Sequence, residues 1–263
     1  MPIETIQSLP YQVYLYALLG GILPALVWLW FWLREDYKSP EPRRMIWRTF
    51  IAGGIVVFIA AFLEKTYLGQ NTAIGIDQLK TINFQFRWSV ATYYFILAHI
   101  PILFGWAFIE EFLKYLAARI AAFYNKNFDE PIDAPIYMIT AAVGFAAIEN
   151  ALFLFNILSR NELGSYFLLT GNLRFLGSTL LHIVCSGLIG GLIGLAFYAR
   201  RTKRLIYTFF GILSATLLHA LFNFFIITNE GRNLMNMLFL LWGATILLII
   251  FFEKVKIITK KYV

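Results

Sequence analysis

The chain has 263 residues, of which 60% are hydrophobic and only 14% are charged, and its mean hydropathy is +0.69. Soluble domains carry about a quarter charged residues, so this composition excludes a soluble protein and predicts an all-α, polytopic membrane helical bundle. The net charge of +7 does not indicate a nucleic-acid partner, because the basic residues lie between hydrophobic segments. A single cysteine, Cys185, excludes an internal disulfide framework.

Hydrophobic segments of about 20 residues, long enough to cross a bilayer, occur about seven times along the chain. We expect membrane spans at residues 11–33, 45–63, 97–120, 135–157, 176–199, 205–227 and 235–252. They leave no room for a soluble domain, so residues 1–263 are predicted to form a single membrane domain. We expect no cleavable signal peptide, because the first apolar run is long enough to stay in the membrane.

The apolar stretch from residue 88 to residue 124 is too long for one span and short for two. Pro101 is the expected break, because proline lacks a backbone N–H and clashes with the preceding turn. Residues 88–100 are therefore expected to form an interfacial or partly inserted helix that leads into the third span.

Lysine and arginine are unevenly distributed between alternate connections. Fifteen of the 22 lie in residues 34–48, 115–133 and 200–204 and in the C-terminal tail, whereas six lie in the other connections. Basic residues accumulate on the cytoplasmic side of membrane proteins. The bias therefore predicts a protein of the plasma (inner) membrane with its N-terminus outside and its C-terminus in the cytoplasm.

Polar and charged residues interrupt four of the predicted spans at similar depths. A charged group inside a bilayer costs about 2.5–3.5 kcal/mol on insertion scales, so each one needs a reason. The residues are Glu110, Glu111, Lys114, Glu149, Asn150, His182, Ser186, His219 and Asn223. Hydrogen bonding between helices explains Asn150, Ser186 or His99 taken alone. Three glutamates and two histidines at one level instead predict a single functional site.

Carboxylates beside imidazoles can activate water in two ways. A glutamate can act as a general base while imidazole or asparagine stabilises an oxyanion, or histidine and glutamate can hold zinc. If a metal is bound, its expected ligands are His182, His219 and either Glu110 or Glu149. The motifs HExxH and GxSxG are absent, and no two adjacent spans carry a pair of aspartates, so zincin, serine and aspartyl chemistries are poorly supported.

Five motifs follow one another between about residues 24 and 225: WFWLREDYKSPEP, EEFLK, GFAAIEN, a histidine in a glycine-rich span, and HALFN. In this order they resemble the PrsW family of intramembrane proteases, relatives of the CAAX-protease (CPBP/Abi) superfamily. The resemblance implies site-1-type cleavage of a membrane protein, with anti-sigma factors as the best-known substrates. In the CAAX relatives the second motif is Phe-x-x-x-His. Here Phe145 is followed four residues later by Glu149, which argues against prenylated substrates.

We therefore predict an intramembrane peptidase that cleaves a single-span protein near its extracytoplasmic boundary. Glu110 or Glu111 is the expected general base. His182 and His219 are expected to stabilise the transition state or to carry protons. Two further side chains have expected supporting roles, an oxyanion donor and a proton-sharing carboxylate: Asn223 and Glu149.

The resemblance and the positive charge of Lys114 favour a metal-free site without a cofactor, with zinc left open. Two other functions are weighed against the peptidase. One is a non-catalytic scaffold, like the γ-secretase subunit in the same superfamily, and the other is a proton-coupled transporter. No inverted repeat of broken helices supports transport. The expected partners are the substrate and the lipid bilayer, and the sequence does not indicate an oligomeric state.

Overall fold

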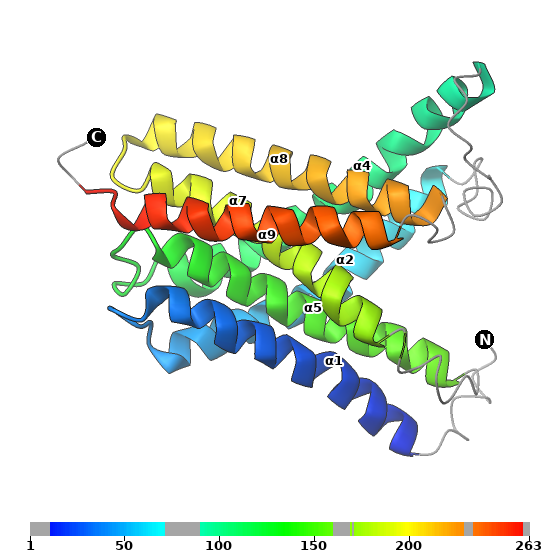
Figure 1. Cartoon of the computed structure of the whole chain (residues 1–263), viewed down its shortest axis with the longest axis horizontal. Helices are drawn as coiled ribbons and strands as arrows, with labels where there is room; N and C mark the ends of the chain where they lie inside the picture. The colour runs from blue at the N-terminus through cyan, green and yellow to red at the C-terminus, as the bar shows by residue number, and fades with distance from the viewer. Residues whose placement is uncertain (1–10, 72–89, 160–168, 170, 229–233, 260–263) are drawn as a thin grey trace.

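The computed structural model describes residues 11–71, 90–159, 169, 171–228 and 234–259. These residues contain seven long α-helices and no strand, arranged as a bundle (Figure 1). The helices are α1 (Tyr11–Trp32), α2 (Arg43–Asn71), α4 (Val90–Ala118), α5 (Asp133–Ser159), α7 (Thr179–Leu195), α8 (Arg201–Thr228) and α9 (Leu234–Lys256). The prediction of an all-α membrane bundle is confirmed.

Short helices of other types adjoin three of the long ones. The 3-10 helix η2 (Leu33–Asp36) follows α1, and the π-helix η3 (Arg119–Phe123) follows α4. The π-helix η4 (Arg174–Ser178) precedes α7. Six of the long helices, all except α4, are identified within the described residues as long and apolar enough to cross a membrane. The seventh, α4, is 29 residues long and carries the acidic pair of the predicted site.

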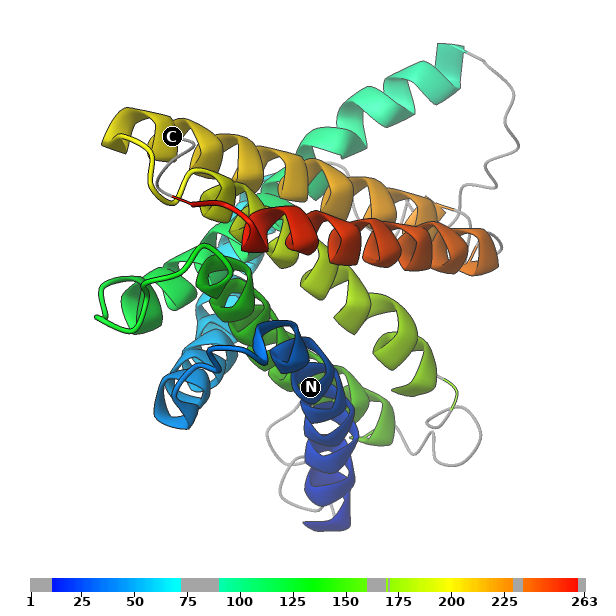
Figure 2. The same ribbon diagram turned by 60° about the vertical axis from the view of Figure 1, so that its left-hand side comes forward.

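The expected break at Pro101 is wrong. The helix α4 runs from Val90 to Ala118 with Pro101 inside it. Prolines are tolerated in membrane helices because neighbouring helices and side chains satisfy the backbone groups that they disturb. A proline frees the carbonyl group of the residue four positions earlier rather than its own. The hydroxyl of Tyr67 on α2 donates to the carbonyl oxygen of Pro101 itself at 3.0 Å, which links α4 to α2 at this point. The N-terminal half of α4 diverges from the other helices (Figure 2), and residues 88 and 89 of the expected interfacial segment lie outside the described part of the chain.

The helices α5 and α7 form the centre of the bundle. In their membrane-crossing segments, 72% of the residues of α5 and 78% of those of α7 are buried inside the protein. The corresponding share for α1, α2, α8 and α9 is between 22% and 39%. The helix α5 packs against α1, α2 and α7, and α7 packs in turn against α8 and α9. The outer helices therefore present most of their apolar side chains to the surroundings, as expected for contact with lipid.

Glycine allows α2 and α5 to cross closely. A Cβ atom on Gly53 of α2 would collide with the carbonyl oxygen of Ala141, and one on Gly144 of α5 would collide with that of Phe50. Lipid is as apolar as a leucine side chain, so membrane helices associate through close packing of small residues. This crossing fixes the position of α5, which carries one of the predicted site glutamates.

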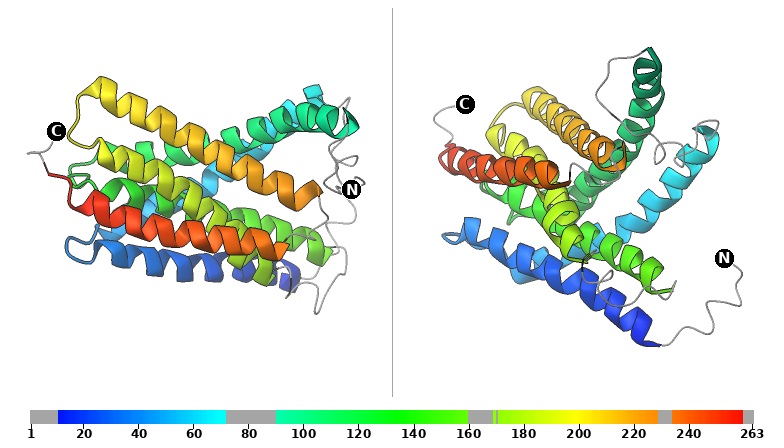
Figure 3. Two further views of the ribbon diagram at one scale, coloured as in Figure 1. Left: turned by 45° about the horizontal axis from the view of Figure 1, so that its top comes forward. Right: turned by 45° about the vertical axis from the view of Figure 1, so that its right-hand side comes forward.

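The basic connections lie together at one end of the bundle. The turns after α1, α4 and α7 and the end of α9 share this end (Figure 3). They include most of the segments from which the orientation was predicted. The arrangement agrees with the alternation of connections, and the side that faces the cytoplasm stays a prediction.

Candidate active site

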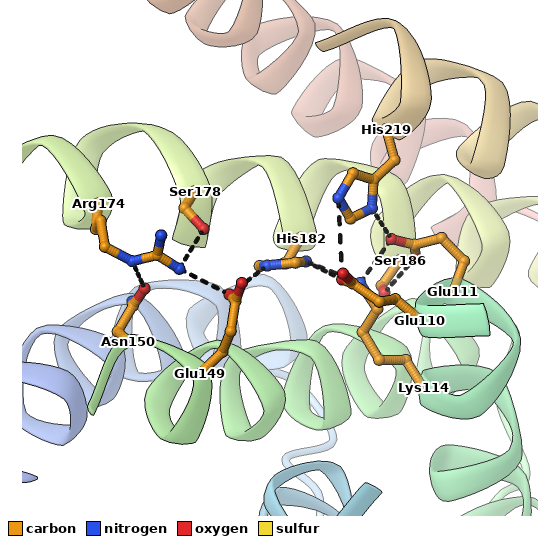
Figure 4. Close-up of polar contacts among 10 residues, drawn as sticks. All are labelled: Glu110, Glu111, Lys114, Glu149, Asn150, Arg174, Ser178, His182, Ser186 and His219. Carbon is orange, nitrogen blue, oxygen red and sulfur yellow. Dashed lines mark hydrogen bonds and ion pairs between the residues drawn. The ribbon is translucent and has the colours of Figure 1, made fainter. Parts of the chain in front are cut away.

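Side chains from α4, α5, α7 and α8 meet in the interior of the bundle (Figure 4). The helix α4 contributes Glu110, Glu111 and Lys114, and α5 contributes Glu149. The helix α7 contributes His182 and Ser186, and α8 contributes His219. All except Glu149 are buried. The structure thus brings together five of the six predicted site residues and Lys114.

Glu111 is the centre of the hydrogen-bond network. Its Oε1 atom lies 2.6 Å from Nζ of Lys114 and 2.8 Å from Nδ1 of His219. The hydroxyl of Ser186 donates to the other oxygen, Oε2, at 3.4 Å. Because a carboxylate only accepts hydrogen bonds, the network assigns the ring proton of His219 to Nδ1. Both oxygens of Glu111 are therefore engaged in holding other side chains.

His182 is held from both sides of its ring. Its Nδ1 atom lies 2.9 Å from Nζ of Lys114, and its Nε2 atom lies 3.0 Å from Oε2 of Glu149. An ammonium group only donates hydrogen bonds, so Nδ1 accepts and the ring proton resides on Nε2. The ring packs at 5.2 Å from that of His219 and at 5.4 Å from that of Phe145, measured between centroids.

Glu110 has a carboxylate oxygen without a hydrogen-bond partner, and this oxygen lies between the two histidine rings. Its Oε2 atom is buried and has no hydrogen-bond partner. It lies 3.8 Å from Nδ1 of His182 and 3.9 Å from Nε2 of His219. Leaving a buried acceptor unpaired costs about 1–3 kcal/mol, and more for a charged group. Binding of a ligand or of a proton to this atom would remove that cost.

These three atoms fit the requirements of a catalytic zinc site. Ligand atoms of Glu110, His182 and His219 all lie within 4.8 Å of one another. Tetrahedral zinc with bonds of about 2.0–2.2 Å separates its ligands by about 3.4 Å, so small movements suffice for coordination. Two histidines and one glutamate leave the fourth position open for water. In each histidine, the ring nitrogen that points away from Glu110 is hydrogen-bonded to another carboxylate. Such hydrogen bonds orient histidine ligands in metal sites.

One contact favours a metal-free site instead. The ammonium group of Lys114 lies against Nδ1 of His182, the lone pair that a metal would use. A bound cation requires Lys114 to leave this atom and to remain paired with Glu111 alone. The sequence left both alternatives open, and the geometry provides one specific observation for each.

The structure adds a residue from outside the expected spans to the site. Arg174 of η4 forms an ion pair with Oε2 of Glu149 at 3.0 Å and donates to Oδ1 of Asn150 at 2.6 Å. The Glu149 side chain is 32% exposed and that of Arg174 is 16% exposed, so this end of the network is the accessible one. A sequence signal exists, because four polar residues recur at intervals of four and therefore share one helix face. They are Arg174, Ser178, His182 and Ser186.

The two asparagines lie outside the centre of the network. Asn150 donates to Oγ1 of Thr179 at 2.9 Å, which is the interhelical hydrogen bonding expected of it. Asn223 lies one turn beyond His219 on α8 and is half-buried. No hydrogen bond links Asn223 to the site within the described residues, and its role as an oxyanion donor stays a prediction.

Comparison with known proteins identifies relatives of the chain. Residues 41–252 match the model of a family described as PrsW family intramembrane metalloprotease. The chain is 28% identical over 206 residues to Protease PrsW of Clostridioides difficile (strain 630), covering 78% of this chain and 76% of the relative. It is 25% identical over 229 residues to Protease PrsW of Geobacillus kaustophilus (strain HTA426), covering 86% and 87%. No solved structure matches the chain significantly. These matches confirm the prediction of a membrane-embedded protease, while the wider CAAX-protease superfamily stays a prediction.

Proposed function

Because the chain belongs to the PrsW family of intramembrane metalloproteases, we propose that it hydrolyses a peptide bond of a membrane-anchored protein at Glu110, His182 and His219. The observation that carries this proposal is the unpartnered Oε2 atom of Glu110, which faces one nitrogen of each histidine. A scaffold has no need of a buried, unsatisfied carboxylate. Family membership also favours a protease over a transporter.

We infer that Oε2 of Glu110, Nδ1 of His182 and Nε2 of His219 hold a zinc-type ion. When bound, such an ion supplies a water of lowered pKa and polarises the carbonyl group of the peptide bond. Glu149 and Glu111 each bind the outer nitrogen of one ring, which fixes the tautomer and aims the lone pair at the site. The family description favours this alternative over the metal-free site that was predicted from the sequence.

The two adjacent glutamates have different roles in this proposal. In the sequence alone, Glu110 and Glu111 are interchangeable candidates for the general base. Glu111 has no free oxygen, because Lys114, His219 and Ser186 bind it, so we assign it to positioning. Glu110 is the carboxylate with a free oxygen, and in this proposal that oxygen would be a ligand of the ion.

A metal-free mechanism is the second candidate, favoured by the contact between Lys114 and His182. In that mechanism Oε2 of Glu110 accepts the proton of the attacking water, and Lys114 compensates the negative charge that develops. The protein residues are the same in both mechanisms. They differ in what neutralises Glu110 and in the position of Lys114.

The substrate class follows from the resemblance drawn from the motifs. We propose a single-span, anti-sigma-factor-like protein that is cut near its extracytoplasmic boundary. The proposed localisation is the plasma membrane, with the N-terminus outside and the C-terminus in the cytoplasm, and it is supported by the distribution of basic residues. We propose that water enters from the end of the network where the side chains of Glu149 and Arg174 are partly exposed.

The experiment measures metal content and cleavage of a single-span reporter substrate with purified protein in detergent. Wild type is expected to contain stoichiometric zinc and to lose cleavage on treatment with a chelator. His182→Asn and His219→Asn should lose both metal and activity. His99→Asn changes the only other histidine of the chain and is the matched control.

One outcome would change the mechanism, and another would reject the assignment of the active site. Metal-free, chelator-resistant cleavage that requires Glu110 would replace the zinc mechanism by the general-base mechanism. Cleavage that survives in both histidine variants and in Glu110→Gln would show that this cluster is not the active site.

A further inference from the structure

A second group of acidic side chains lies at the end of the bundle where the turn after α1 meets the start of α5. Asp36 is the last residue of η2, Glu41 lies in the connection to α2, and Asp133 is the first residue of α5. One carboxylate oxygen of each lies within 4.8 Å of the others. Asp133 and Glu149 are sixteen residues apart on α5, which corresponds to about 24 Å, so this cluster is separate from the active site.

Within the part of the chain that the structure describes, the three carboxylates of this cluster form no ion pair. Asp36 is only 4% exposed, and its Oδ2 atom has no hydrogen-bond partner. Lys256, a cation at the same end of the bundle, is paired with Glu35 at 2.7 Å and with Glu253 at 2.6 Å. Buried charges are normally paired or bound to metal ions.

The hydrogen bonds of the other two carboxylates hold them in place. Oδ2 of Asp133 accepts the backbone N–H groups of Asp129 at 2.8 Å and of Glu130 at 2.7 Å. Glu41 accepts a hydrogen bond from the hydroxyl of Tyr137, a residue of α5 that is fully buried. The cluster is therefore built from two rigid elements and a short connection.

Glu41 lies outside the membrane spans, and its pKa is affected by the other carboxylates of the cluster. Burial, together with the neighbouring Asp133 and Asp36, raises the pKa of Glu41 to about 8, against the lowering effect of the Tyr137 hydrogen bond. A carboxylate in this position is stabilised by a proton or by a cation.

A cavity leads to the cluster from outside. It has a volume of about 510 Å³ and is lined by Asp36 and Glu41 together with Leu33, Pro40 and Arg43, among others. This volume is large enough for several water molecules beside the carboxylates. A cation at the carboxylates can therefore enter and complete its coordination with water.

We propose that Asp36, Glu41 and Asp133 bind a hard divalent cation, Mg²⁺ or Ca²⁺, which fastens the connection between α1 and α2 to the start of α5. An all-oxygen set of carboxylates suits these ions, whereas the histidine-containing active site suits transition metals. Two positive charges compensate most of the charge of three carboxylates. The cation stabilises the end of the bundle opposite the N-terminus of α1 and takes no part in hydrolysis.

The test measures thermal unfolding of the full chain in detergent after all metals have been removed with a chelator. Adding Mg²⁺ or Ca²⁺ is expected to raise the melting temperature by about 2 °C or more in a saturable way, compared with KCl of equal ionic strength. The ion with the lower midpoint concentration is the preferred one. Asp36→Asn and Glu41→Gln should abolish the shift, whereas Asp129→Asn, an exposed carboxylate of the neighbouring turn, should retain it.

His219→Asn separates this site from the active site, because the variant should keep the full response to Mg²⁺ or Ca²⁺. The proposal is overturned if neither ion stabilises the wild type beyond the KCl control. It is also overturned if the shift is unchanged in both Asp36→Asn and Glu41→Gln. If Asp36→Asn does not yield folded protein, Glu41→Gln decides, because Glu41 lies in a connection and is less buried.

Discussion

Replacing each of the adjacent glutamates by glutamine should abolish cleavage in both variants but change stability in only one. In Glu111→Gln the ammonium group of Lys114, which is fully buried, loses the carboxylate that lies 2.6 Å away. Breaking a buried ion pair by removing one partner costs about 3–5 kcal/mol, because an uncompensated charge stays inside. In Glu110→Gln the substituted oxygen is one that has no hydrogen-bond partner. This change should leave the free energy of unfolding of metal-free protein within about 1 kcal/mol of wild type or raise it.

Unfolding is measured by a thermal or denaturant melt of chelator-treated protein in detergent, so that bound metal does not contribute to stability. Cleavage of the reporter substrate is measured in parallel with untreated protein. The double variant Glu111→Gln, Lys114→Met removes both charges, and it should recover part of the lost stability if the pair is the cause. Equal destabilisation of Glu110→Gln and Glu111→Gln would refute the assignment of separate roles. Retained cleavage in both single variants would remove both glutamates from the mechanism.

Three further outcomes are expected. Glu149→Gln should lower metal affinity or cleavage by about 10–100-fold, less than His182→Asn, because Glu149 only orients the ring, and a titration of cleavage against zinc measures this. Gly144→Leu should destabilise the protein by about 1–3 kcal/mol in a thermal melt, whereas Gly243→Leu, where an added Cβ meets nothing within 4 Å, should not. Reporter fusions at Lys203 and Gly231 should give opposite readouts of sidedness, and identical readouts would contradict the predicted orientation.

The number and order of the long helices could be predicted from the sequence, because a bilayer imposes a minimum length on every apolar segment. Pro101 shows the limit of this reasoning. Local chemistry predicts a break there, but the helix continues through it beside a hydroxyl of α2. The packing of a neighbouring helix is not visible in the residues around Pro101.

The candidate site could also be predicted in outline. Ionisable residues are costly in a membrane, so Glu110, Glu111, Glu149, His182 and His219 stand out in the sequence without any alignment. Arg174 did not stand out, because a basic residue near the end of a span is expected to lie at the interface. Its spacing of eight residues from His182 was the available signal.

The sequence by itself determined that the chain is a helical membrane protein and that several buried carboxylates and imidazoles share one level, since both follow from the cost of placing polar groups in lipid. Only the tertiary structure decided which nitrogen of each histidine faces Glu110, which glutamate is already engaged, and that Asp36, Glu41 and Asp133 meet at the far end. These distinctions depend on how helices distant in sequence are rotated and shifted against one another. Close packing at small residues such as Gly53 and Gly144 sets that rotation, and the periodicity of a single helix does not contain it.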